Sequence, residues 1–449
     1  MRMVTRASLD VSCRVKNYQW AATMTVKQSV GDLSSDDPFD VIVLGAGYAG
    51  LMATLRMARR KLRLRIALVS TRDCFIERVR LQEAIATEVP LRIPSIAAFV
   101  RNTPAKFIRG TVLSLDADRR RVRIATDNQQ LELAFHQAVY ALGSDINAVD
   151  ILGASDHAYR LEAKDGSRSG KALHLKLSES GNRSLRVIVV GGAETGVEAA
   201  GEIKAAWPSM EVTIVTRGRC GNFRGPRVEK VVRTQLTRLG VKLIDGETIA
   251  EVRPNEIITG KGRSITCDIC VWSTGLHSSP IARKAGIATD ERGRIMVDAN
   301  LRSLTHQQIL AVGDAARPIA PTGAPYRQSA FAALVSGAYA ADVILAQKSR
   351  RRIRPFSFST FGQGVAVGRG GVGFFSYPDD MQRWFIVKGR AAHHIRNVFV
   401  WLVCYVLKVE RRLPGIFFWL GRRRVSWRQA NDAVDLAHSV LGLGPAAAE

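Results

Sequence analysis

The chain contains two glycine-rich turns of the same kind, GAGYAG at 45–50 and GGAETG at 191–196. An apolar run rich in valine and isoleucine precedes each turn, and a helix-like stretch follows it. A buried strand that enters a tight glycine turn and continues into a helix is the dinucleotide-binding unit of a parallel sheet. Because the chain has two such turns, we expect two nucleotide-binding sites, each on its own sheet.

The segments around the turns predict an α/β fold with two Rossmann-like dinucleotide-binding domains. Short strand-like runs between 107 and 133 predict a β-meander inserted before the second turn. Strands are expected over 40–44, 64–70, 186–190, 211–216 and 309–312, and helices over 48–59, 195–206 and 328–346.

In the first turn, each glycine has its own physical role. Gly45 permits the sharp turn, Gly47 lets a pyrophosphate approach the backbone, and Gly50 lets the helix pack closely on the strand. The helix N-terminus then offers free N–H groups and its positive dipole end to the phosphates. The acidic residue expected about 20 residues later is absent. Ser70 stands there instead, with a hydroxyl that can bind a ribose.

Further motifs complete a set: YALGS at 140–144, WSTGL at 272–276 and AVGDAA at 311–316. Together with the two turns, this set resembles the two-dinucleotide-binding-domain flavoproteins of the pyridine nucleotide–disulfide oxidoreductase superfamily over residues 38–345. FIERVRLQEA at 75–84 and the C-terminal region are most similar to type II NADH dehydrogenases and to apoptosis-inducing-factor-like or ferroptosis-suppressor-like NAD(P)H–quinone reductases. The resemblance implies FAD on the first turn and NADPH or NADH on the second.

The resemblance also implies a domain order in which the second nucleotide-binding domain is inserted into the first, followed by a C-terminal α+β region. The expected parts are a disordered N-terminal extension (1–37), an FAD-binding domain (38–155 and 299–346), an NAD(P)H-binding domain (156–298) and a membrane-interface or dimerisation region (355–449).

The family pattern supplies site residues for both cofactors. Val112 would contact the adenine, Asp314 would accept a hydrogen bond from the ribityl chain, and the helix near 328 would point its positive end at the isoalloxazine. The FAD residues implied are Gly45, Gly47, Tyr48, Ala49, Gly50, Ser70, Arg78, Val112, Ala141, Gly143, Gly313, Asp314 and Ala332. The NAD(P)H residues implied are Gly191, Ala193, Glu194, Thr195, Gly196, Thr216, Arg217 and Gly275.

The second site favours the phosphorylated cofactor. The resemblance associates Ala193, which replaces the middle glycine, with NADPH. The next strand ends in Thr216, Arg217 and Arg219, where an acid would bind a 2′-hydroxyl and repel a 2′-phosphate. A hydroxyl and two guanidiniums suit a phosphate. Alternatively, these arginines belong to the general arginine excess of the chain.

One residue is a candidate for the hydride-transfer centre. The resemblance places Glu198 near the junction of nicotinamide and flavin, whereas a solvated helix face with Lys204 is the alternative. No metal site is expected. Only Cys74 lies where disulfide reductases carry a cysteine pair. Cys267 and Cys270 lie on an expected strand whose alternate faces would separate them, so we expect them to be structural.

The acceptor is the open part of the prediction. Type II NADH dehydrogenases carry an AQxxxQ-like helix motif beside the flavin. In the matching segment 329–337, Phe331 and Val335 replace the glutamines. The polar contacts of a standard quinone site are therefore missing. The adjacent pair His393-His394 does not face one way on a helix, so we expect it to be non-catalytic.

Charge and composition bear on partners. The net charge is +25, mostly from arginine, which favours an anionic membrane surface or an acidic electron-carrier protein. Within 396–428, apolar stretches with tryptophan and arginine flanks suit a membrane interface or a homodimer contact. The longest apolar run, Val398–Leu407, is too short to span a bilayer. Six scattered cysteines indicate a reducing compartment, so we expect a cytoplasmic protein, peripheral on the inner face of the membrane.

Three functions remain open at this point. The first is an FAD-dependent NAD(P)H oxidoreductase that passes electrons to a quinone-like acceptor. The second is a ferredoxin-type electron-carrier reductase whose basic surface docks an acidic iron–sulfur protein. The third is a non-catalytic nucleotide-sensing or nucleic-acid-binding flavoprotein. Nucleic acid is the least expected partner because no base-reading motif is present.

Overall fold

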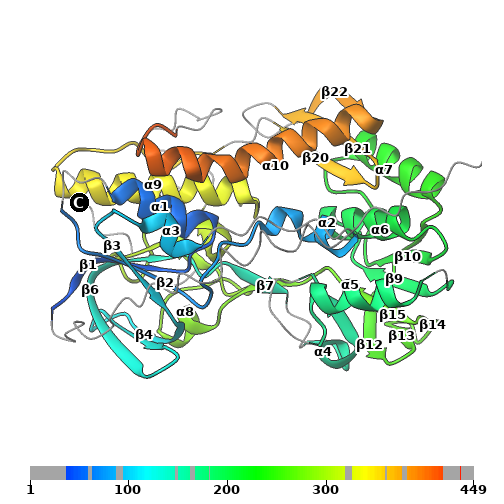
Figure 1. Ribbon diagram of the computed structural model, residues 1–449, viewed down its shortest axis with the longest axis horizontal. Coiled ribbons are helices and arrows are strands. Elements are labelled where there is room, and N and C mark those ends of the chain that lie inside the picture. Colours follow the sequence, from blue (N-terminus) through cyan, green and yellow to red (C-terminus); the bar gives the residue numbers. More distant parts are fainter. Residues whose placement is uncertain are drawn as a thin grey trace, which may run out of the picture.

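The computed structural model describes residues 37–58, 63–86, 95–146, 150–161, 167–181, 183–318, 326–358, 362–376, 382–417 and 435. The expected N-terminal extension therefore lies outside the described residues, except for Asp37. The described chain forms two α/β units side by side, and one long helix runs across both (Figure 1).

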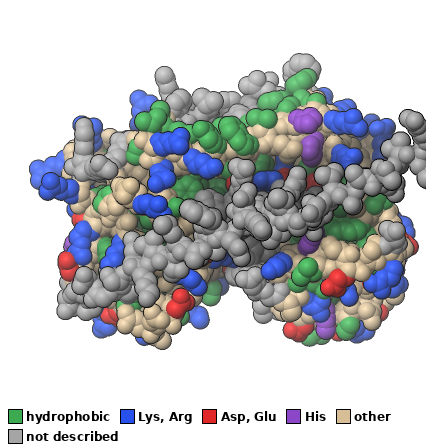
Figure 2. Space-filling view, in the orientation of Figure 1, with side chains coloured by type: hydrophobic (Ala, Val, Ile, Leu, Met, Phe, Trp, Pro, Cys, Tyr) green, Lys and Arg blue, Asp and Glu red, His purple; other side chains and the backbone are tan. Residues whose placement is uncertain are grey.

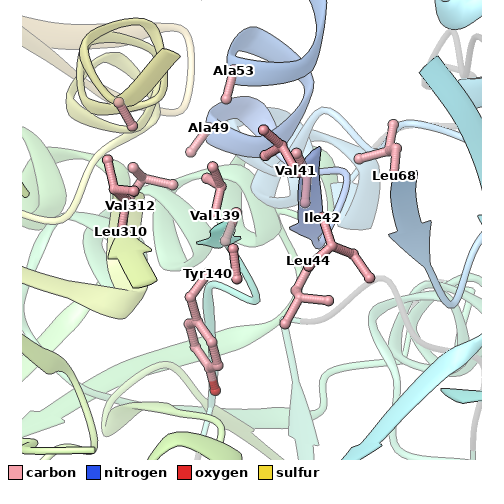
Figure 3. Packing of buried hydrophobic residues seen from close by; sticks show 14 of the residues in the cluster. Val41, Ile42, Leu44, Ala49, Ala53, Leu68, Val139, Tyr140, Leu310 and Val312 are labelled. Carbon is pink, nitrogen blue, oxygen red and sulfur yellow. The ribbon is translucent and has the colours of Figure 1, made fainter. Parts of the chain in front are cut away.

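The first unit is built on a seven-stranded sheet in the order β3-β2-β1-β6-β5-β4, with β18 beside β6. Strand β1 reads FDVIVL and is buried along nearly its whole length, as expected for a central strand covered on both faces. Its Val43 lies opposite Leu68 on one side and Val139 on the other. Figure 3 shows the apolar packing of this core around Val41, Ile42 and Leu44 of the same strand. The strands are β1 (Phe39–Leu44), β2 (Ile66–Ser70), β3 (Ala105–Arg109), β4 (Thr111–Asp116), β5 (Arg121–Ala125), β6 (Gln130–Tyr140) and β18 (Ile309–Ala311).

The parallel part of this sheet consists of β3, β2, β1, β6 and β18, and β4-β5-β6 form the antiparallel meander. Helix α1 (Tyr48–Met57) and helix α9 (Ala330–Lys348) pack together above the sheet. Their contact is close, because a Cβ at Gly337 would overlap the carbonyl oxygen of Ala49. The β-meander expected over 107–133 therefore begins later, at β4, and ends with β6, because β3 belongs to the parallel part of the sheet.

Helix α9 is long and apolar enough to cross a membrane, the one such helix among the described residues. Most of it is buried against α1 and the first sheet, which is the arrangement of a core helix.

The second unit is a five-stranded parallel sheet in the order β11-β10-β9-β15-β8. Three helices lie on it, α5 (Gly170–Glu179), α6 (Glu194–Ala206) and α7 (Pro226–Leu239). The strands are β8 (Ala158–Arg160), β9 (Arg186–Val190), β10 (Glu211–Thr216), β11 (Lys242–Asp245) and β15 (Ile269–Trp272). A small antiparallel sheet accompanies them: β12 (Ile249–Arg253), β13 (Glu256–Thr259) and β14 (Ser264–Thr266).

Short elements connect the two units. The antiparallel pair β7–β16 spans the junction, and α2 packs on α5 and α6 of the second unit. Ile295 and Val297 lie within the segment 156–298 that is predicted to form the second domain, but they pack in the core of the first unit. The exact division of the chain into domains stays a prediction. These connecting elements are η4 (Arg78–Arg80), α2 (Leu81–Ala86), α3 (Ile96–Val100), β7 (Ser144–Ile146), α4 (Ala154–His157), β16 (Leu276–Ser278), α8 (Ile281–Lys284), β17 (Ile295–Val297), η5 (Gly313–Ala315) and β19 (Ala316–Pro318).

The C-terminal region is a three-stranded antiparallel sheet followed by a long helix: β20 (Gly362–Val367), β21 (Gly370–Ser376), β22 (Gln382–Lys388) and α10 (Gly389–Arg412). The sheet packs on α6 and α7 of the second unit, and α10 continues across to α1 of the first (Figure 1). The charged segment 408–412 forms the end of this helix.

Candidate functional site

The first glycine turn lies at the carboxyl end of β1, and two of its glycines are required by the fold. Gly45 has a φ of 106°, a left-handed conformation that favours glycine. A Cβ at Gly50 would overlap the carbonyl oxygen of Gly45. At Gly47, by contrast, a Cβ would meet nothing within 4 Å. The fold therefore leaves open space at Gly47, where the backbone can meet a ligand.

A polar cluster lies near this turn, formed by three separate segments. The Ser144 hydroxyl donates to Asp314 Oδ2 at 2.8 Å, and the Arg78 guanidinium donates to the Ser144 carbonyl at 2.8 Å. The Gly313 N–H donates to the Ser336 hydroxyl of α9 at 2.9 Å. The structure thus brings together Arg78, Gly143, Gly313 and Asp314, as predicted for one site. A half-buried carboxylate held in this way can accept a hydrogen bond from a polyol.

Other predicted FAD residues contribute packing through their side chains. The Tyr48 hydroxyl lies 3.8 Å from Cys404 Sγ of α10, and burial raises the pKa of this tyrosine well above its usual value. Ala49 packs against Gly337, and Val112 is buried in the first core. Ser70 accepts the Arg72 N–H at 3.2 Å within its own turn. Ala141 donates its N–H to Leu44, and Ala332 donates its N–H to the Ser329 cap of α9.

The second turn repeats the geometry of the first at the end of β9. Gly191 has a φ of 118°, and a Cβ at Gly196 would overlap its carbonyl oxygen. Ala193 is the exposed N-cap residue of α6, so its methyl group stands at the open side of the turn. Glu194 and Thr195 begin α6, and burial raises the pKa of the Glu194 carboxyl. Gly275 follows β15 with a φ of 80°.

Cations surround the end of β10, but they differ in how they are paired. Arg219 lies 2.7 Å from Glu229, and Arg233 lies 2.7 Å from Asp245. Arg217, which directly follows Thr216, is exposed, and within the described part of the chain it makes no hydrogen bond or ion pair. Of these arginines, Arg217 therefore has its full charge available for a ligand.

Glu198 lies on α6 in a buried cluster that the sequence did not predict. Arg396 of α10 donates to both of its oxygens, at 3.3 Å from Nε and 3.1 Å from Nη2. The Ala366 N–H of β20 donates to Oε1 at 2.9 Å. Arg396 also binds Glu83 of α2. The signal in the sequence was the place of Arg396 on the apolar side of an amphipathic helix, four residues after Ala392.

The Cys267–Cys270 pair requires a correction. Strand β15 begins at Ile269, so Cys267 precedes the strand and the alternation argument does not apply. Both cysteines are buried in the same apolar cluster and both are free. Burial raises the pKa of Cys267 to about 11 and that of Cys270 further. Their structural role stays a prediction. Among the described residues, no group of three or more His, Cys, Asp or Glu side chains that could hold a metal ion was found.

Glu202, one turn after Glu198, makes stability depend on pH. Burial, together with the charges of Glu83 and Glu198, raises the pKa of Glu202 from 4.5 to about 7. The folded protein then binds a proton that the unfolded chain releases, so the free energy of unfolding falls as pH rises from about 4.5 to 7. The single site contributes up to about 3 kcal/mol. Urea unfolding at pH 5.5 and 8 should show a smaller difference for Glu202→Gln than for the wild type.

The exposed Glu211 provides the matched control for that experiment. It pairs with Lys242 at the surface, so Glu211→Gln should keep the wild-type pH difference. An equal pH difference in Glu202→Gln and the wild type would show that Glu202 does not hold this proton.

Comparison with protein families gives one match that covers most of the chain. The family model described as pyridine nucleotide-disulphide oxidoreductase matches residues 39–337. Among curated relatives, demethylphylloquinone reductase NdbB of Synechocystis is 24% identical over 344 residues, or 74% of this chain and 85% of that protein. Ferroptosis suppressor protein 1 of Taeniopygia guttata is 27% identical over 297 residues, or 63% of this chain and 76% of that protein.

Solved structures share the fold at low identity. NDH2 from Plasmodium falciparum, in complex with NADH, has a TM-score of 0.69 at 15% identity, covering 87% of this chain and 100% of that one. A NAD-dependent persulfide reductase from A. fulgidus has a TM-score of 0.65 at 21% identity, covering 76% of this chain. This chain spans 64% of the length of that reductase.

Proposed function

The chain belongs to the pyridine nucleotide-disulphide oxidoreductase family and is an FAD-dependent enzyme that uses NAD(P)H, and we propose that it takes hydride from NADPH and delivers the electrons to a quinone-like acceptor at a membrane surface. The observation that carries the proposal is the pair of glycine turns at the carboxyl edges of two sheets, with open backbone at Gly47 and an exposed Arg217 at the end of β10.

The residues around the first turn fit FAD. The open space at Gly47 admits a pyrophosphate, whereas side chains at Gly45 and Gly50 would meet protein. Asp314, held by Ser144, suits the ribityl hydroxyls. The α9 N-terminus, near Gln328, presents a positive dipole end toward Asp314, since the Gln328 amide donates to the Asp314 carbonyl at 3.4 Å. When bound, FAD supplies hydride acceptance and electron relay, and the protein supplies orientation and electrostatics.

The second site supports NADPH over NADH. Thr216 stands where an acid would repel a 2′-phosphate. Beside it Arg217 offers an exposed guanidinium that has no ion-pair partner among the residues that the structure describes. An engineered water-forming oxidase, described as bound to NADPH, has the same fold with a TM-score of 0.66 at 16% identity. Its substitutions replace an aspartate with alanine and introduce two arginines. The end of β10 has the same kind of charge, with a threonine where an acid is expected and an arginine next to it, and this supports NADPH as the nucleotide.

The surroundings of α9 support an apolar acceptor. Val335 is fully buried in the core, so it forms no part of an acceptor site. Phe331 lies in the first turn of α9 and packs against Phe358 and Phe417, with ring centroids 5.7 and 6.5 Å away. The aromatic ring of Phe331 thus stands in place of one of the two amides expected for a standard quinone site, and this aromatic surface favours a flat, uncharged acceptor. The relatives named as quinone reductases point to the same class of acceptor.

The outer face of α10 supports docking on an anionic membrane. Val398 and Trp401 are 63% and 60% exposed, and Leu402 and Tyr405 continue the stripe. Figure 2 shows hydrophobic side chains gathered along this edge, with lysines and arginines nearby. The helix carries cations at both ends: Lys388, Arg390, Lys408, Arg411 and Arg412. An apolar stripe with cationic ends is the pattern of a helix that lies in the interface of an anionic bilayer.

We expect Trp401→Glu/Leu402→Glu to abolish binding to vesicles that contain anionic lipid. Two exposed apolar side chains that would insert into the bilayer are replaced by carboxylates, which the anionic lipid repels. Co-sedimentation with vesicles measures the binding. Reduction of ferricyanide by NADPH in solution should be unchanged. Leu175 on α5 is 51% exposed and provides the control, because Leu175→Glu should still bind. Full binding by the double variant would move the membrane contact elsewhere.

The function itself is tested with the purified holoenzyme under anaerobic conditions. NADPH should bleach the bound flavin faster than NADH, and a short-chain quinone should then restore its colour without any added carrier protein. Reoxidation only by an acidic iron–sulfur protein would favour the electron-carrier reductase. A flavin that neither nucleotide reduces would favour a sensing role and contradict the proposal.

A further inference from the structure

Arg396 lies where three parts of the molecule meet. Its side chain comes from α10, and the residue is 4% exposed. It donates to the carbonyl of Val79, whose side chain packs against the first core, at 3.1 Å. It also binds Glu198 on α6 of the second unit and Glu83 on α2, the connecting helix that follows Val79 and packs on α5 and α6. One guanidinium therefore joins both nucleotide-binding units through the C-terminal helix.

The two carboxylates are themselves fixed in place. Glu83 also pairs with Arg80 at 3.0 Å, and Glu198 accepts the Ala366 N–H of β20 at 2.9 Å. A fork of N–H donors that binds two fixed acceptors defines both their distance and their orientation. In a buried position, such a charged contact selects one arrangement of the surrounding elements and is weak evidence for net stability.

The far end of α10 is attached differently. Arg56 of α1 binds Glu410 at 2.8 Å and Asp342 of α9 at 3.0 Å. These three residues all belong to α10 or to the first unit. The Gly415 N–H completes this contact by donating to Glu410 at 2.6 Å. The helix is thus anchored to the first unit by Arg56, whereas it bridges the two units at Arg396. Figure 1 shows α10 running from the second unit across to the first.

We propose that Arg396 is a positioning residue for hydride transfer, which, by binding the Val79 carbonyl, Glu83 and Glu198 at once, fixes how closely the nucleotide on the second unit approaches the flavin on the first. This inference rests on the proposed function, because it assumes FAD on the first turn and NADPH on the second. Hydride transfer needs reacting atoms at roughly 3–3.5 Å, and a displacement of about 1 Å can cost on the order of a hundredfold in rate. Glu198 acts here through Arg396, since its carboxylate is bound by protein donors.

Anaerobic stopped-flow reduction of the flavin by NADPH tests this proposal, because it separates the rate constant of hydride transfer from the dissociation constant of NADPH. In Arg396→Gln and in Glu83→Gln, the rate constant should fall roughly tenfold to a hundredfold. Flavin content and the NADPH dissociation constant should change little. Glu83→Gln leaves Arg396 paired with Glu198, so it tests the bridge even where the arginine variant does not fold.

Arg56→Gln is the matched control, since it also removes a buried arginine that holds α10. It should lower the melting temperature and leave the rate constant of hydride transfer unchanged. The proposal is overturned if folded, flavin-loaded Glu83→Gln transfers hydride at the wild-type rate, or if Arg56→Gln slows it equally. A wild-type flavin that neither NADPH nor NADH reduces would instead be a failure of the proposed function.

Discussion

Replacing Gly47 by glutamate is expected to give a folded protein that contains no flavin. A side chain at this position meets no protein atom within 4 Å, so the fold itself does not oppose it. The carboxylate would stand where the pyrophosphate approaches the backbone and would repel its negative charge. The visible absorption spectrum of the purified protein measures flavin content, and circular dichroism measures the fold.

Two further variants make this result specific. Gly218 also has open space around its Cβ position and lies at the second site, so Gly218→Glu should keep its flavin. At Gly50 a Cβ would overlap the Gly45 carbonyl oxygen, so Gly50→Ala should damage the fold as well as flavin binding. A Gly47→Glu protein with full flavin would remove the first turn as the FAD site.

The turns and their strands could be predicted because the signals are local. Strands β9 and β10 begin and end at the predicted residues, 186–190 and 211–216. Both are apolar runs of β-branched residues, and the first ends at a glycine turn, so burial and turn chemistry define the same boundaries. The same is true of the first turn, where the position of each glycine in the motif separates Gly45 and Gly50, which the fold needs, from Gly47, which is left open.

The buried charge cluster could not be predicted, because its members are distant in sequence. Arg396 and Glu198 are 198 residues apart, and Glu83 lies still further away. Periodicity can place an arginine on the buried side of α10. It cannot identify the carboxylate whose attraction offsets the cost of removing this arginine from water. The motif alone therefore predicts that Glu198 lies near the junction of nicotinamide and flavin. In the structure its oxygens are bound by Arg396 and Ala366.

Two further differences concern the residue at which a strand begins and the face of a helix that is covered. Cys267 lies just before β15, so the alternation of a strand does not separate it from Cys270. In α9, Phe331 remains half-buried among aromatic rings, whereas Val335, one turn later, is in the core. A motif position identifies a residue along a helix, but which face of that helix is covered depends on packing by elements that are distant in sequence.

Arg217→Glu is expected to reverse the preference for NADPH. The guanidinium has no protein partner within the described residues, so its hydrogen bonds and charge are free for a 2′-phosphate. Losing a charge-assisted hydrogen bond costs about 1.5–3 kcal/mol, and the new carboxylate adds repulsion. The dissociation constant of NADPH should therefore rise by roughly a hundredfold or more. That of NADH, which lacks the phosphate, should change little.

Arg219 supplies the comparison for this variant, because it shares the strand end but is already paired with Glu229 at 2.7 Å. Its charge is largely neutralised by that carboxylate, so Arg219→Gln should weaken NADPH much less than Arg217→Glu. Anaerobic titration of flavin reduction with each nucleotide measures both constants. If Arg217→Glu left the ratio of the two constants unchanged, Arg217 would lie outside the site, and the free cation would be part of the general surface charge. If Arg219→Gln had the larger effect, the ion pair with Glu229 must open on binding, and the phosphate would lie nearer to α7.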